Sequence, residues 1–89
     1  MHAVGMEVSG MELDFTAAQA LALTVARRLA EDAMLLAWFD RERGRESPQV
    51  PECQHKHGWL AYAESHVGDL KVDVNRGAYV FIFATGRQG

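Results

Sequence analysis

The chain has 89 residues, of which 48% are hydrophobic and 24% are charged, and it carries a net charge of −3 at pH 7. This composition excludes a disordered chain, a collagen and a disulfide-bonded scaffold, and the length allows one domain, covering residues 1–89. Nucleic acid is disfavoured as a partner because the chain has no strong basic excess to neutralise phosphates.

The first third of the chain predicts a strand followed by a long helix. Residues 1–10 show weak periodicity and are expected to form a loose N-terminal segment or a short edge strand. Residues 11–15 alternate between apolar and acidic side chains, which is typical of a half-buried strand. Thr16 and Gln19 have the spacing of a capping box, so a helix is expected over 17–30. Its apolar stripe, which predicts that the helix covers a sheet, consists of Ala18, Leu21, Ala22, Val25 and Leu29.

The apolar run at 33–40 is open to two interpretations. It could extend the helix, or it could form a buried strand, because periodicity does not separate the two over so short a run. Glu31 and Asp32 disfavour the extension, since acidic groups near a helix C-terminus oppose its dipole. We therefore predict a strand at 34–40. Residues 41–58, which contain Gly and Pro, are expected to form a long connection.

The last third predicts a three-stranded meander, with strands at 59–65, 70–74 and 78–84 and a tail at 85–89. The fold class is therefore α+β. One main helix packs on one face of a mostly antiparallel sheet of four or five strands, which ends in this C-terminal meander.

The turn at 75–77 sets which side chains of the meander share a face. A three-residue turn would place Val74 opposite Ala78, so that Val80 and Ile82 face the helix. The bulky rings would then lie on the opposite, uncovered face. That aromatic face would consist of Leu60, Tyr62, Tyr79, Phe81 and Phe83.

An exposed aromatic face of this kind is typical of an interface between protein chains. We therefore expect a homodimer or a protein partner to cover it. Two alternatives are that residues 41–58 or the N-terminal segment fold over it, or that it stacks the bases of a single-stranded nucleic acid. The last alternative is disfavoured by the acidic side chains expected on the same face.

A second candidate site is formed by Cys53, His55 and His57, which project to one side of an extended segment. A thiolate and two imidazoles suit zinc or copper, with His66 or Asp40 as a further ligand if the fold brings one of them near. The same Cys53 could instead be a nucleophile, with a histidine as base and Asp40 orienting it.

A third candidate is an arginine cluster at Arg41, Arg43 and Arg45, which alternates with Glu42 and Glu46. It is either a solvated, self-neutralised turn or a clamp for an anion, because the planar guanidinium group matches phosphate and carboxylate oxygens.

The lone cysteine and the lack of a signal peptide or a long apolar stretch favour a reducing cytoplasm and no membrane. The segments LLAWFD (35–40), SP (47–48), Cys53, GWLAYA (58–63) and DVNRGAYVFIF (73–83) resemble a small uncharacterised prokaryotic domain family over residues 11–84. The resemblance implies a compact α+β domain and transfers no activity and no catalytic residue. The sequence thus predicts a non-enzymatic binding module that acts as a homodimer without a cofactor, with a zinc or thiol site as the alternative.

Overall fold

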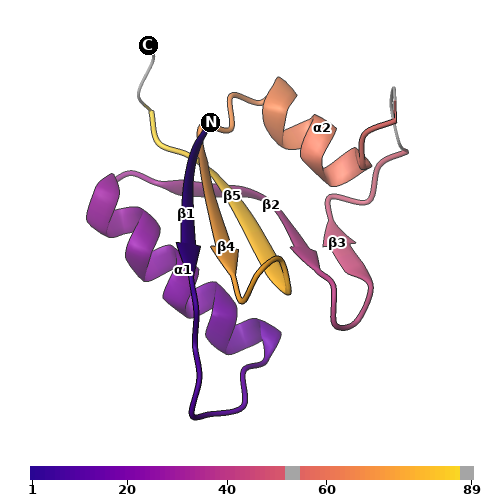
Figure 1. The fold of residues 1–89 in the computed structure, drawn as a ribbon. Coiled ribbons are helices and arrows are strands. Elements are labelled where there is room, and N and C mark those ends of the chain that lie inside the picture. The colour runs from indigo at the N-terminus through magenta and orange to yellow at the C-terminus, as the bar shows by residue number, and fades with distance from the viewer. Residues whose placement is uncertain (52–54, 87–89) are drawn as a thin grey trace.

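The computed structural model describes residues 1–51 and 55–86, which form a five-stranded sheet with strand order β1-β4-β5-β2-β3 (Figure 1). The helices are α1 (Phe15–Leu29) and α2 (Gly58–Ser65). The strands are β1 (His2–Met6), β2 (Met34–Asp40), β3 (Arg45–Ser47), β4 (Leu70–Val74) and β5 (Tyr79–Ala84). The central strand pairs are antiparallel, while β1 runs parallel to β4 at the edge. This confirms the α+β fold with a main helix on a mostly antiparallel sheet.

Helix α1 forms where the sequence predicts it, but its N-cap differs from the prediction. Asp14 is the N-cap residue, and its side chain accepts a hydrogen bond from the Ala17 N–H at 2.8 Å. An acidic cap is favourable because it meets both an unpaired N–H and the positive end of the helix dipole. Residues 11–14 lie in the connection that precedes the helix, so the predicted strand at 11–15 and the Thr16 cap are wrong.

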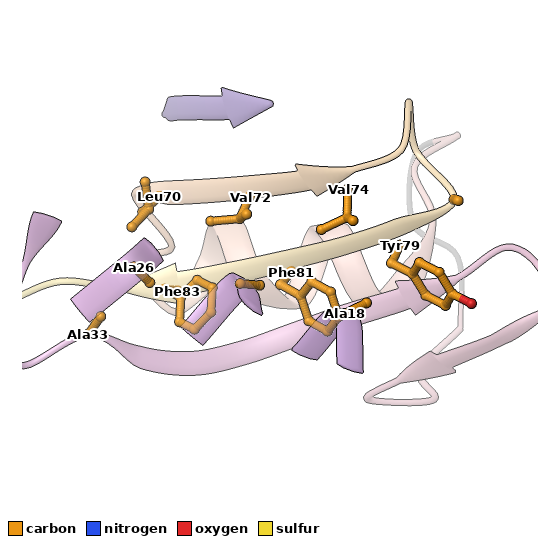
Figure 2. Packing of buried hydrophobic residues seen from close by; sticks show 11 residues of the cluster. Ala18, Ala26, Ala33, Leu70, Val72, Val74, Tyr79, Phe81 and Phe83 are labelled. Atoms are coloured by element: carbon orange, nitrogen blue, oxygen red, sulfur yellow. The ribbon is translucent and has the colours of Figure 1, made fainter. Parts of the chain in front are cut away.

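The main core lies between α1 and the sheet. The helix contributes the alanine stripe Ala18, Ala22 and Ala26, and the sheet contributes large side chains, among them Phe81 and Phe83 (Figure 2). Small residues on the helix let its backbone come close to the rings, which fill the space that the alanines leave. Ala26 takes the place that the prediction gave to Leu29, which is 43% exposed.

The segment predicted as the first strand of the meander is helix α2, which packs on the other face of the sheet. Trp59 and Ala63, one helical turn apart, are buried against Val80 and Ile82. The predicted strand at 59–65 is therefore wrong. The sequence pattern did not show this, because periodicity does not separate a helix from a strand over an eight-residue segment such as α2. A Cβ atom at Gly58 would clash with the backbone of Val50, so the start of the helix requires glycine.

The turn between β4 and β5 is one residue longer than predicted. It runs from Asn75 to Ala78, and the Ala78 N–H donates to the Asn75 carbonyl at 3.2 Å. Val74 therefore pairs with Tyr79 rather than with Ala78. Because side chains alternate along a strand, this one-residue shift exchanges the two faces of β5.

Two smaller differences concern the ends of loops. The connection at 41–58 contains β3, which pairs with β2 through a turn at 41–44. Thr85, the first residue of the predicted tail at 85–89, is held in place by hydrogen bonds. Thr85 donates from its N–H and its hydroxyl group to the carboxylate of Asp69, at 3.0 and 2.6 Å. Residues 87–89 lie outside the described residues.

We predict that Phe81→Ala lowers the free energy of unfolding by about 3–5 kcal/mol, because the lost ring leaves a cavity between α1 and the sheet. Urea unfolding followed by circular dichroism measures the change. Met11→Ala is the control, since Met11 is 59% exposed and its truncation should change stability by less than about 0.5 kcal/mol. Equal effects of the two substitutions would contradict the core that we describe.

Candidate functional sites: an open sheet edge and a charged hollow

The aromatic residues predicted to form an exposed face are mostly in the core. Tyr79, Phe81 and Phe83 are 5%, 0% and 1% exposed and belong to the cluster under α1. Leu60 and Tyr62 lie on α2 rather than on a strand, and both are half-buried. The prediction that these five residues share one uncovered face is wrong, because the longer turn reverses β5 and residues 59–65 are helical.

Among the described residues, the outer edge of β1 has no pairing partner along the strand. On the inner side, the His2 N–H donates to the Asp69 carbonyl and the Met6 carbonyl accepts from the Asn75 N–H, both at 2.9 Å. The register pairs Val4 with Val72 of β4 in the same ladder. On the outer side, no strand among the described residues pairs with β1 (Figure 1). The sheet therefore offers one full-length strand for a further pairing.

The opposite edge of the sheet is poorly suited to pairing. β3 has only three residues, two of which are the charged Arg45 and Glu46, and Pro48 follows directly. The part of β2 that β3 leaves uncovered contains a register shift between Leu35 and Ala37. Short length, charge, proline and bulges are the features that protect sheet edges from association.

A charged hollow of about 330 Å³ lies between the first turn of α1 and the hairpin of β2 and β3. The register aligns Tyr79, Asp40 and Arg45 in one row across β5, β2 and β3. Asp40 is the middle residue of this row. The residues that line the hollow are Asp14, Phe15, Thr16, Trp38, Asp40, Arg43 and Arg45.

The predicted arginine cluster is divided by this geometry. Arg43 and Arg45 line the charged hollow, whereas Arg41 lines only a neighbouring hollow of about 490 Å³, which Arg43 also borders. The Nη1 atom of Arg41 donates to the Arg76 carbonyl at 3.3 Å. The structure thus brings two of the three arginines to one site, next to the carboxylates of Asp14 and Asp40.

The sequence profile of the family described as Domain of unknown function (DUF5619) matches residues 1–83. The chain belongs to this family. A crystal structure of a protein from Archeoglobus fulgidus has a similar fold, with a TM-score of 0.82 and 27% sequence identity. The match covers 100% of this chain and 99% of the Archeoglobus chain. No curated protein matches the chain.

The proposed metal and thiol site is only partly within the described residues. Cys53 lies outside them, and His55 and His57 are exposed. The His57 ring stacks on Phe39, with centroids 6.3 Å apart, on the α2 side of the sheet. Asp40, the next residue of β2, points to the α1 side, so it does not join these histidines as ligand or orienting group. Residues 1–51 and 55–86 contain no cluster of three or more potential metal ligands.

The residues that sequence analysis missed come from non-local pairing. Asp14 and Trp38 reach the hollow from α1 and β2, and a local pattern does not show that these elements meet there. The β2–β3 hairpin had one usable signal, Gly44, which adopts a positive φ of 63° in its turn.

Within the described residues, neither helix is long and apolar enough to cross a bilayer.

Tyr79 lies beside the charged hollow, and the pKa of its hydroxyl group is shifted. Burial raises its pKa above the ordinary value of 10.0, and the nearby carboxylates of Asp40 and Glu42 raise it further. The hydroxyl group donates to the Leu13 carbonyl at 3.1 Å, which ties the connection before α1 to β5.

We predict that Tyr79→Phe lowers the free energy of unfolding by about 1 kcal/mol at neutral pH, because it removes this hydrogen bond. Tyrosine in the unfolded chain ionises near pH 10, while folded Tyr79 keeps its proton to higher pH, so its contribution is complete below pH 10. The advantage over Tyr79→Phe should shrink as pH rises from about 10 through the raised pKa. Urea unfolding of both proteins across this range checks it, and a constant or growing advantage would contradict it.

Proposed function

We propose that the chain is a small interaction module that self-associates as a homodimer through the outer edge of β1. This edge replaces the aromatic face as the contact surface. The observation that supports it is that β1 is a full-length edge strand without charge, proline or bulge, whereas the β3 edge is short and charged. The lone Cys53 favours a reducing cytoplasm as the compartment.

The backbone groups of β1 are arranged for pairing. In a parallel ladder, alternate residues direct both their N–H and C=O groups to the same neighbour. His2 and Met6 bond toward β4, which gives Val4 the same direction. Ala3 and Gly5 therefore direct their N–H and C=O groups outward, where no strand of the described residues meets them.

A second copy satisfies these groups in one register. In an antiparallel pair related by a two-fold axis, Ala3 of each chain would face Gly5 of the other, and each such pair would exchange its N–H and C=O groups. Val4 would face Val4 of the second copy at the axis. Since His2–Met6 contains no Asp, Glu, Lys or Arg, this arrangement opposes no like charges.

An apolar contact accompanies the strand pairing. Leu29, at the end of α1, is 43% exposed and lines a hollow of about 240 Å³ together with His2. In the same register, His2 faces Met6 of the second copy on the α1 side of the sheet. The Met6 side chain of the second copy would then cover Leu29 of the first. An interface made of one pair of five-residue strands and this apolar contact is small, so we expect a concentration-dependent dimer with micromolar affinity.

We predict that Gly5→Pro makes the protein monomeric at concentrations where the wild type is a dimer in sedimentation equilibrium. Proline removes an outward N–H and leaves the bonds between β1 and β4 in place. Gly5→Ala is the matched control and should stay dimeric, because its Cβ atom meets nothing within 4 Å and its N–H is retained. Leu29→Ser should weaken the dimer without touching the strand.

A monomeric wild type at high concentration, or a Gly5→Pro variant that still dimerises, would reject the β1 interface. Association that appears only when another protein is added would instead indicate that β1 receives a foreign strand.

The alternative function is a zinc or thiol site at Cys53, His55 and His57. Its prediction is that untagged protein contains about one zinc per chain by elemental analysis and loses it in Cys53→Ser. Protein that contains no metal and gains no thermal stability from added zinc would reject the metal site and leave the β1 proposal unaffected.

A further inference from the structure

Four charged side chains line the hollow beside the first turn of α1 without pairing to one another. They are Asp14, Asp40, Arg43 and Arg45. The ion pairs of the described residues are Lys56–Glu64 and Arg76–Glu7, and neither contributes to this hollow. Asp14, Arg43 and Arg45 are exposed, so water can separate these charges, and a ligand that carries both signs could bridge them.

Each carboxylate in the hollow accepts a backbone hydrogen bond through one oxygen, which leaves its second oxygen for a ligand. The Oδ1 atom of Asp14 accepts from the Ala17 N–H at 2.8 Å, and the Oδ1 atom of Asp40 accepts from the Arg43 N–H at 3.1 Å. The Oδ2 atoms accept no hydrogen bond from a described residue. Asp40 is only 2% exposed, and a carboxylate so buried is costly unless a positive donor meets it.

The arginines and the aromatic rings complete the lining. The guanidinium groups of Arg43 and Arg45 make no hydrogen bond to a described residue. Their forked donors fit a carboxylate group. Phe15 and Trp38, with ring centroids 4.4 Å apart, supply an apolar wall to the same hollow. The volume of about 330 Å³ is within the range of small-molecule sites.

We propose that this hollow binds a small zwitterion of the amino-acid class. The ammonium group of the ligand would be held by Asp14 and Asp40, its carboxylate by Arg43 and Arg45, and its apolar side chain by Phe15 and Trp38. A ligand with only a negative charge would be repelled by the two carboxylates, and one with only a positive charge by the two guanidinium groups. A ligand with both charges satisfies all four groups.

The test is an NMR titration of the full chain with three probes of the same shape. L-leucine carries both charges, isocaproate lacks the ammonium group, and isoamylamine lacks the carboxylate. We expect L-leucine to cause saturable shifts at the amides of Phe15, Arg43 and Arg45, with a millimolar or lower Kd. Each single-charge analogue should bind at least about tenfold more weakly, because it leaves either the two carboxylates or the two guanidinium groups of the hollow without an opposite charge.

Two variants separate the two halves of the site. Asp40→Asn keeps the Oδ1 acceptor for Arg43 and should weaken L-leucine about tenfold, while isocaproate binding stays equal or tightens. Arg45→Gln, at an exposed position, should weaken L-leucine and spare isoamylamine, which keeps the test valid if Asp40→Asn does not fold. Arg28→Gln, in the last turn of α1, is the matched control and should change nothing.

The absence of saturable shifts with L-leucine would overturn the proposal, as would equal affinity for L-leucine and either analogue. Saturable binding of inorganic phosphate that Asp40→Asn leaves unchanged would replace it with a simple anion site. These outcomes are independent of the β1 edge, because the proposal does not require a dimer.

Discussion

The turn at 75–78 controls the packing of the whole molecule, because it sets the register of β4 against β5. The Ala78 N–H closes the turn on the Asn75 carbonyl, and the Asp73 side chain accepts from the Gly77 N–H. With this register, Phe81 and Phe83 meet the alanines of α1. A turn shorter by one residue would put the smaller Val80 and Ile82 against the alanine stripe, and the space between helix and sheet would be underfilled. The complementarity of small helix residues and large strand residues therefore selects the longer turn.

The charged hollow depends on a second register, that of β5 against β2. This register aligns Tyr79 with Asp40, and the β2–β3 hairpin extends the row to Arg45. Phe15, the first residue of α1, packs on Trp38 and on Phe81, so the N-terminal turn of the helix is held over the row. The two registers meet in β5, which carries Phe81 against the helix and Tyr79 beside Asp40. A change in the length of the turn at 75–78 would reverse β5 and move both rings to the other face.

Local patterns were sufficient for the elements that a long run of residues defines. The Ala- and Leu-rich segment at 17–30 gave α1, and the apolar run at 34–40 gave β2. They failed where a short segment, 59–65, had to be assigned to helix or strand, and where one residue of turn length decided the face of β5. The arginines at 41–45 pointed to a charged site, but the carboxylates that complete it come from α1 and β2. That juxtaposition depends on tertiary packing, which periodicity does not encode.

The two proposed contacts lie at opposite edges of the sheet. β1 forms one edge and β3 the other, and three strands separate them (Figure 1). Pairing of two β1 strands would therefore extend the sheet while leaving the hollow beside β3 at the far end of each copy. The charges of Arg45 and Glu46 serve two purposes in this arrangement. They make the β3 edge unsuitable for strand pairing, and Arg45 supplies a donor to the hollow. The dimer would thus carry two ligand sites far from its axis, each formed within one chain, and ligand binding would neither require nor disturb association.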